Sequence, residues 1–343
     1  MTGSRVLNGG TNTGIGRALG RRAFLKSTTI ALAGMCAGLG STVGNRPSAI
    51  AAETLKTLRM GYQKYGTLVL LKTMGALEKR LEPLGIAVTW TEFPDGPKLM
   101  EAINLGSIDF GTTGDAPPIV AQAAGTPFVY VGHEPPAPKG EAVVVLDGSP
   151  IRSVGDLKGK RLAVNRGSNV HYLSLRALAK AGLGVGDVEF VFLPPADGRP
   201  AFERGTVDAW AIRDPFLAAI EIDIPVRVIA DGASVGVSNY QFYHATRELR
   251  ERHPAVIAAI LKEIATVDES AKQDVPRIAA VLAPAIGMKT EAVERALGRM
   301  GFGVRPLDRE VVGEQQRLAD TFFAAILIPR KIDVSAVVST ALF

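Results

Sequence analysis

Apolar and polar positions alternate in two ways along this chain of 343 residues. From residue 55 onward, short apolar segments are separated by amphipathic stretches of helical spacing, which is typical of an α/β protein. The apolar segments, bounded by turn residues, predict strands at 57–61, 87–92, 108–111, 128–132, 141–146, 161–165, 188–193, 207–213, 226–230 and 240–246.

Helical spacing predicts helices between these strands, at 67–81, 98–105, 117–124, 170–181, 199–204 and 215–222. After about residue 249 only helices are predicted, at 254–272, 276–285, 290–300 and 308–326. A βα chain that ends in helices alone indicates two sheet-bearing lobes with a helical tail packed on one of them.

An internal similarity supports two lobes. Residues 105–109 (Leu-Gly-Ser-Ile-Asp) and 204–208 (Arg-Gly-Thr-Val-Asp) both place glycine at a helix end, where it can adopt a left-handed cap, before a strand begins. We predict lobe one at 52–139, lobe two at 140–246, and a helical return to lobe one at 247–343. The proline-rich stretch 133–140 and the strand at 240–246 would join the lobes, and two such connections are typical of a protein that closes on a ligand.

Two strand–turn–helix segments predict anion sites. In residues 107–118 an apolar strand enters a Gly/Thr turn, and a helix follows with Asp115 placed as its N-cap. Amides at a helix start have no partner inside the helix, and the macrodipole adds positive potential there. A second such turn lies at 162–170. Two such sites that face each other across a cleft would hold a small anion.

The first 51 residues predict an export signal that is later removed. Arg21 and Arg22 lie in a segment that resembles the twin-arginine pattern, and small residues at 49–51 suggest cleavage before Ala52. We therefore expect a soluble periplasmic protein. Cys36 is the single cysteine and lies in this segment, but the large Met35 before it disfavours lipoprotein anchoring. After cleavage no disulfide or thiolate metal site could form.

Charge and glycine content exclude two classes of function. Six basic residues and no acidic ones lie before residue 52, so 33 Lys and Arg remain against 34 Asp and Glu, and we predict no nucleic-acid partner. The glycine-rich turn at 9–16 resembles a dinucleotide-binding turn. It lacks a preceding buried strand and a following acidic residue, so an unstructured leader is favoured.

Five short motifs in the same order resemble the periplasmic solute-binding proteins of aliphatic sulfonate ABC importers. They lie at 61–64, 106–118, 134–139, 167–171 and 195–212, within a resemblance that runs from about residue 58 to residue 245. The resemblance implies a monomeric, two-lobe periplasmic binding protein of type II, with its helical C-terminal tail packed on lobe one. It also implies a small organic anion as ligand, and a membrane permease and ATPase as partners for uptake of sulfur.

The family's pocket carries over to matching positions of this chain. Gln63 would offer its amide to the ligand head group, and the backbone amides of Thr113, Gly114 and Asp115 would begin the anion site of lobe one. The resemblance assigns the facing site to Ser168, Asn169 and Val170, and the end of a lobe-two strand to Arg213 and Asp214. A sulfonate stays charged and needs hydrogen-bond donors rather than proton transfer.

Position 213 departs from the family, which commonly has an aromatic residue before this Asp-Pro pair. We predict that Arg213 favours a ligand with additional negative charge, such as a carboxylated sulfonate or a sulfate ester. The alternative is that Arg213 pairs with Asp214 or a surface acid and does not meet ligand. Taurine, nitrate, sulfate esters and a pyrimidine precursor remain alternative ligands for a protein of this architecture.

No catalytic signature accompanies these motifs. The four histidines lack metal-site spacing, and no nucleophile-and-base pattern occurs, so we predict a binding protein without metal, cofactor or enzymatic activity. An enzyme related to the thiamine-pyrimidine synthases is disfavoured because their histidine and cysteine cluster is missing. His171 is interpreted as an ordinary first-turn residue, Asp115 as a helix cap, and Trp210 and Phe242 as core residues.

Overall fold

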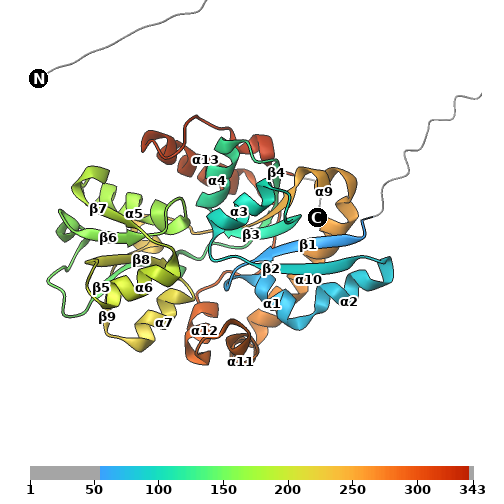
Figure 1. Cartoon of the computed structure of the whole chain (residues 1–343), viewed down its shortest axis with the longest axis horizontal. Coiled ribbons are helices and arrows are strands. Elements are labelled where there is room, and N and C mark those ends of the chain that lie inside the picture. The colour runs from blue at the N-terminus through green and yellow to red at the C-terminus, as the bar shows by residue number, and fades with distance from the viewer. Residues whose placement is uncertain (1–54, 340–343) are drawn as a thin grey trace, which may run out of the picture. The chain divides into compact units, whose positions relative to one another are not determined.

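The computed structural model describes residues 55–339, whose strands form two five-stranded sheets (Figure 1). The first sheet contains β1 (Thr57–Tyr62), β2 (Ala87–Glu92), β3 (Phe110–Gly114), β4 (Phe128–His133) and β10 (Gln241–Thr246). The second contains β5 (Glu141–Leu146), β6 (Arg161–Val164), β7 (Glu189–Phe192), β8 (Ala209–Arg213) and β9 (Val226–Asp231). The ten strand predictions are thus confirmed, while the export signal, Cys36 and the glycine-rich turn lie outside the described residues.

The two sheets share one topology. Their strand orders are β2-β1-β3-β10-β4 and β7-β6-β8-β5-β9. In each sheet one strand runs antiparallel to both neighbours, namely β10 in the first and β5 in the second. The other pairings are parallel, so the carboxyl ends of β1, β3, β6 and β8 provide the strand-end loops where ligands of such sheets bind.

The strand β10 belongs to the first sheet, although the predicted boundary placed residues up to 246 in lobe two. It pairs with β3 and β4, and its residues Phe242 and Tyr243 are fully buried. The boundary therefore has to be moved to between β9 and β10. An apolar pattern indicates that a strand exists but does not say which sheet it joins, which explains the error. Below, lobe one and lobe two denote the parts built on the first and second sheets.

The repeated glycine–aspartate segment has the same geometry in both lobes. Gly106 has a φ of 65°, and Asp109 accepts hydrogen bonds from the backbone amide and side chain of Arg59 on β1. Arg59 also donates to the carbonyl of Gly106. The same contacts recur in lobe two between Gly205, Asp208 and Arg161. The internal similarity seen in the sequence is therefore a structural repeat.

Helices flank both sheets. Within lobe one and its connections they are α1 (Thr67–Met74), α2 (Ala76–Leu81), α3 (Gly96–Asn104) and α4 (Ala116–Ala124). Lobe two contains α5 (Asn169–Lys180), α6 (Pro195–Glu203), α7 (Phe216–Asp223) and α8 (Gly232–Val235). The tail contains α9 (Arg247–Arg252), α10 (Pro254–Gln273), α11 (Val275–Ile286), α12 (Thr290–Leu297) and α13 (Arg309–Ala324). Five short 3₁₀ turns complete the described elements.

The helical tail packs mainly on lobe one, as predicted. Buried residues of α10 and α11 share one core with α1 and the first sheet, and α13 packs beside α4. The exception is α12, which packs on α7 of lobe two through the alanines Ala218, Ala219, Ala292 and Ala296. Small side chains at this contact let the two helices approach closely.

The helix predictions were imperfect in two respects. The predicted helix at 67–81 is interrupted at Gly75, which has a φ of 62° and ends α1 as a left-handed cap. The short helices α8 and α9 were missed, because four or six residues carry too little periodicity to be recognised. Among residues 55–339, no helix is both long and apolar enough to span a bilayer.

Candidate functional site

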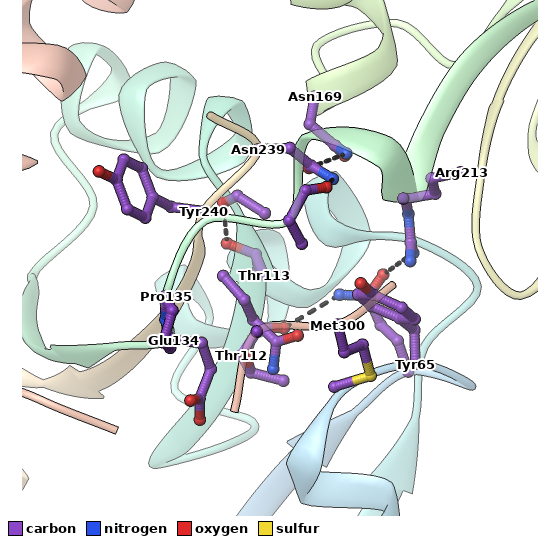
Figure 2. A pocket seen from close by; sticks show the side chains of 16 residues that line it. Tyr65, Thr112, Thr113, Glu134, Pro135, Asn169, Arg213, Asn239, Tyr240 and Met300 are labelled. Atoms are coloured by element: carbon purple, nitrogen blue, oxygen red, sulfur yellow. Dashed lines mark hydrogen bonds between the residues drawn. The ribbon is translucent and has the colours of Figure 1, made fainter. Parts of the chain in front are cut away.

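Two small cavities lie side by side between lobe one and lobe two. Their volumes are about 20 Å³ for the first and about 10 Å³ for the second, and we call them the first and second cleft cavities. Four residues from strand ends and a helix start line both of them: Gln63, Gly114, Asn169 and Arg213. Figure 2 shows that Asn169 and Arg213 approach the site from the same lobe. The predicted residues from both lobes thus meet at one place.

Helix starts surround the second cleft cavity. Gly96 of α3, Pro117 of α4, Pro195 of α6, and Asn169 and Val170 of α5 lie in first turns and line it. Proline has no amide hydrogen, so α4 and α6 offer fewer donors here than α5. Within residues 55–339, the amides of Asn169 and Val170 donate no hydrogen bond to a backbone carbonyl. The start of α5 is therefore the best anion-binding helix end in the cleft.

Arg213 reaches across the cleft from lobe two to lobe one. Its Nη2 donates a hydrogen bond of 2.5 Å to Oε1 of Gln63, and its guanidinium lies 5.5 Å from the ring centroid of Tyr65 (Figure 2). The amide of Gln63 is fixed in turn, because its Nε2 donates to the carbonyl of Thr112 at 3.0 Å. Burial lowers the pKa of Arg213 from its ordinary value.

The sequence left open that Arg213 pairs with the carboxylate of Asp214 or of a surface acid, and this pairing does not occur in the described part of the chain. No described residue in the range 55–339 forms an ion pair with Arg213, and its contact with Asp214 is to the backbone carbonyl, at 3.3 Å. A half-buried cation that contacts no carboxylate of residues 55–339 is well placed to bind an anion. Its preference for a doubly charged ligand stays a prediction.

Asn169 links the cleft cavities to lobe two and to the connection between the lobes. Its Nδ2 donates to Glu141 Oε2 at 2.8 Å and to Asn239 Oδ1 at 3.0 Å. Burial, reinforced by Asp115, raises the pKa of Glu141 well above its ordinary value. A methyl group added at Gly114 would lie 3.0 Å from the Oδ1 of Asn169, so a larger residue would require Asn169 to shift.

Thr113 is held in place by lobe one itself. Its hydroxyl lies 2.9 Å from Nε2 of His244 and 2.9 Å from the carbonyl of Gly114. Burial lowers the pKa of His244 to about 3, so the ring is neutral. Thr113 lines the first cleft cavity, while Ser168 and Val170 line the second. The Ser168 hydroxyl donates to the carbonyl of Asn165 at 2.7 Å and orients the turn before α5.

Asp115 lines neither cleft cavity, and the predicted side-chain cap is wrong. Its backbone is helical, with φ −74° and ψ −34°, whereas a capping residue needs an extended backbone to aim its carboxylate at the first-turn amides. Gln315 of α13 donates to its carbonyl at 2.7 Å. Burial raises the pKa of Asp115 to about 7, so the carboxyl group is partly protonated at neutral pH.

Asp214 also lines neither cleft cavity. Its Oδ1 accepts a hydrogen bond from the amide of Ala218 in α7 at 3.0 Å and lies 3.5 Å from Nη1 of Arg299. Burial raises the pKa of Asp214 to about 7 despite this cation. The side chain of Asp214 therefore holds the start of α7 and the segment after α12 together.

The sequence did not reveal the part of the site formed by the connections between the lobes. Tyr65, Tyr240, Gln241, Met300 and Gly301 line the first cleft cavity together with residues of the 134–140 stretch. The proline-rich stretch was recognised as a connection but not as a wall of the site. Met300 lies in the tail after α12, although a helix was predicted up to residue 300, and no local pattern indicated that it reaches the cleft.

The remaining side-chain interpretations are confirmed, with two additions. Phe242 is fully buried in lobe one, and Trp210 is a core residue of lobe two that also borders the second cleft cavity. The Nδ1 of His171 accepts a hydrogen bond from the amide of Gly167 at 3.2 Å, and burial lowers its pKa to about 4.

Within the described part of the chain, no cluster of three or more His, Cys, Asp or Glu could hold a metal ion.

Comparison with known proteins gives a consistent picture. A family model described as NMT1/THI5 like matches residues 82–266. An aliphatic sulfonates-binding protein of Escherichia coli (strain K12) is 43% identical over 289 residues, which cover 83% of this chain and 90% of that protein. The taurine-binding periplasmic protein of the same organism is 31% identical over 181 residues, 52% of this chain and 55% of that protein.

A solved structure agrees with the sequence comparisons. The alkanesulfonate-binding protein SsuA from Xanthomonas axonopodis pv. citri, bound to MOPS, superposes with a TM-score of 0.80 at 40% identity. The match covers 84% of this chain and 99% of that one. Both lobes and the tail therefore have counterparts in a single relative.

Proposed function

We propose a function on the following basis. The chain belongs to the NMT1/THI5-like family and, within it, to the aliphatic sulfonate-binding proteins. It is the solute-binding component of an ABC importer, and it binds an aliphatic sulfonate in the cleft between its lobes for uptake as a source of sulfur. The permease and ATPase of that importer are its partners. No bond of the ligand is made or broken.

One observation carries this proposal. In the described part of the chain, Arg213 contacts no carboxylate, and it lines the same cavity as the amides at the start of α5, which donate to no backbone carbonyl there. A sulfonate has three acceptor oxygens and one negative charge, so it can accept from these amides and from the guanidinium at the same time. The amide group of Gln63 adds a neutral partner on lobe one. Donors from both lobes on one ligand would stabilise the closed form.

Binding requires the lobes to move. The two cleft cavities, at about 20 and about 10 Å³, have room for about one water molecule each, far less than an organic ligand needs. The Arg213–Gln63 contact must therefore open to admit ligand, after which Arg213 turns from Gln63 to the sulfonate. The ligand stabilises closure only through contacts that the open form lacks.

The proposal is tested by thermal shift and calorimetry with the protein from residue 52 onward. We expect methanesulfonate and ethanesulfonate to raise Tm in a concentration-dependent manner, since a ligand that binds only the folded state stabilises it by mass action. Small-angle scattering should show a smaller radius of gyration with ligand. If no sulfonate changes either quantity at millimolar concentration, the proposed function is wrong.

The location of the protein is part of the proposal. Removal of residues 1–51 after twin-arginine export would place it in the periplasm. Fractionation of the native organism, with N-terminal sequencing of the recovered protein, tests this. We expect a periplasmic chain that starts at Ala52, and recovery of the full-length chain from the cytoplasm alone would contradict it.

Taurine is the second candidate ligand. The observation that favours it is the 31% identity to a taurine-binding protein over about half of the chain. Taurine carries an ammonium group beside its sulfonate. Among residues 55–339, the ionisable groups that line the first cleft cavity are Tyr65, Glu134, Arg213 and Tyr240, and Asp95 lines the second. Figure 2 shows the carboxyl group of Glu134 pointing away from Asn169 and Arg213. We therefore expect simple alkanesulfonates to bind more tightly than taurine in the same thermal-shift series.

A further inference from the structure

Two buried carboxyl groups, one from each lobe, act on each other across the cleft. Asp115 of lobe one directly precedes α4, and Glu141 of lobe two begins β5. The exposed fractions of these residues are 4% and 0%. Oδ1 of Asp115 and Oε1 of Glu141 have no hydrogen-bond partner among residues 55–339. An ionised carboxylate is costly to bury unless a cation or several donors replace its water.

Close contacts between the lobes bring the two groups near each other. Asp115 follows Gly114, where an added methyl group would lie 3.0 Å from Oδ1 of Asn169. The Nδ2 of Asn169 donates to Oε2 of Glu141 at 2.8 Å, and also to Oδ1 of Asn239 (Figure 2). The side chain of Asn169 therefore lies between the neighbour of Asp115 and the carboxyl group of Glu141.

Burial and repulsion keep this pair from being doubly ionised. Burial, and next the charge of Asp115, raise the pKa of Glu141 well above its ordinary value, although Arg213 acts in the opposite direction. Burial also raises the pKa of Asp115 to about 7, with a contribution from Glu314 of α13. At neutral pH the two carboxyl groups together therefore hold a proton in this arrangement.

Other titratable groups surround the pair. Asp231 of β9 adds negative charge near Glu141. The amide of Asp214 donates to the carbonyl of Gly140 at 2.8 Å, and burial raises the pKa of the Asp214 carboxyl to about 7, so this group also titrates near neutral pH. The neighbouring tyrosines are neutral, because burial raises the pKa of each: Tyr65, Tyr130 and Tyr172.

We propose that Asp115 and Glu141 form a proton-binding site shared between the lobes, and that closure on a sulfonate takes up a proton there. This inference rests on the proposed function, because ligand entry separates the lobes and with them the two carboxyl groups. In the open form each group loses the repulsion of the other, so its pKa falls and the proton leaves.

The proton also favours the ligand. An ionised Glu141 would place a negative charge beside Asn169, whose backbone amide belongs to the proposed anion site, and would repel the sulfonate. Protonation removes this charge when the anion is bound. Glu141 is thus a positioning residue that acts on the ligand through Asn169, and its protonation state sets the affinity.

Proton uptake makes sulfonate binding tighter at lower pH. A sulfonate stays ionised, so the pH dependence comes from the protein. Uptake of a proton strengthens binding by at most about tenfold for each pH unit that is lowered. The range from pH 6 to pH 8 suits the measurement, since burial lowers the pKa of His171 to about 4 and that of His244 to about 3.

The test is calorimetry of ethanesulfonate with the protein from residue 52 onward, at pH 7 in imidazole, bis-Tris and Tris. These buffers differ in their enthalpy of protonation and have no sulfonate group, unlike MOPS, to which the related alkanesulfonate-binding protein is bound. The change of the binding enthalpy with buffer gives the number of protons taken up. We expect uptake of up to about one proton per ligand, and affinity that increases from pH 8 to pH 6.

Carboxyl variants locate the proton. Asp115→Asn combined with Glu141→Gln keeps both shapes but removes the site, so proton uptake should disappear and the affinity should no longer depend on pH. Each single variant should lower the uptake, which keeps the test valid if the double variant folds poorly. Glu189→Gln is the matched control, because Glu189 on β7 is exposed and lines neither cleft cavity. It should take up protons as the unmodified protein does.

Two results would overturn the shared site while sulfonate still binds. The first is binding by the unmodified protein without proton uptake, or with release of protons. The second is uptake that is unchanged in the carboxyl variants, which would place the proton elsewhere, for example on Asp214. If no sulfonate binds at any pH, the proposed function is refuted instead.

Discussion

Arg213 on lobe two and Gln63 on lobe one are joined across the cleft by a hydrogen bond of 2.5 Å, from the guanidinium to the side-chain carbonyl. Gln63 follows β1 and Arg213 ends β8, and these strands hold the second and third positions of their strand orders, so the counterpart of β8 in the first sheet is β3. The contact therefore joins strand ends that hold different positions in the two sheets. A charged donor comes from one lobe and a neutral acceptor from the other.

The first prediction concerns this charged donor. Arg213→Gln should weaken binding of ethanesulfonate about tenfold to a hundredfold, because a hydrogen bond to a charged group contributes about 1.5 to 3 kcal/mol. Calorimetry at low and high salt measures it, and the loss should be smaller at high salt. The control is Arg204→Gln, an exposed arginine remote from the cleft cavities. Equal affinities of the Arg213 variant and the unmodified protein would show that Arg213 does not meet ligand.

The second prediction concerns ligand charge. If Arg213 favours additional negative charge, Arg213→Trp should lower the affinity for a sulfocarboxylate more than the affinity for a simple alkanesulfonate of the same length. The arginine has no ion-pair partner among residues 55–339, so its charge is available to a second anionic group. Competition calorimetry with the two ligands measures the ratio. An unchanged ratio contradicts the idea, whatever the absolute affinities.

The fold was largely predictable because its elements are local. Apolar segments bounded by turn residues placed all ten strands, and glycine at residues 106 and 205 marked the repeat. The sheet to which β10 belongs was not predictable. It joins the first sheet by pairing with residues more than a hundred positions earlier, Thr113 and His133 among them. Such pairings depend on packing between distant segments, for which no local pattern exists.

The sequence predicted site residues correctly only where the role of a residue follows from the local backbone around it. Asn169 and Val170 are at a helix start, as the pattern indicated, and Gly114 lies where an added methyl group would press on the side chain of Asn169. Asp115 does precede a helix, as predicted, but it does not cap it. Capping depends on backbone angles that the sequence does not specify. Met300 could not be foreseen, since it reaches the cleft only through the packing of α12 on α7.

The third prediction uses the close approach of the lobes at Gly114. In Gly114→Ala the new methyl group would lie 3.0 Å from Asn169, so Asn169 must shift and its hydrogen bonds to Glu141 and Asn239 are strained. We expect weaker sulfonate binding and less compaction in scattering, with a small change in Tm. Gly148→Ala is the matched control, because a methyl group there meets no atom within 4 Å. Equal binding by both variants would falsify the closure geometry.

The fourth prediction is a pH dependence of stability that comes from Asp115. Burial raises its pKa from the ordinary 3.8 to about 7, so between these values the folded state binds more protons than the unfolded state. This group's contribution to the free energy of unfolding therefore falls as pH rises, by at most about 1.4 kcal/mol per pH unit. Asp115→Asn keeps the shape but removes the titration.

We expect Tm of Asp115→Asn minus Tm of the unmodified protein to increase from pH 5 to pH 8, by a few degrees. The reason is that only the unmodified protein must bury a carboxylate at the higher pH. Measuring a difference removes contributions that both proteins share, such as the buried histidines, His244 among them, which act in the opposite direction. Asp320→Asn on α13 is the control, because its carboxylate is exposed to solvent in the folded protein. A difference that stays constant or decreases with pH would mean that Asp115 is already ionised in the fold.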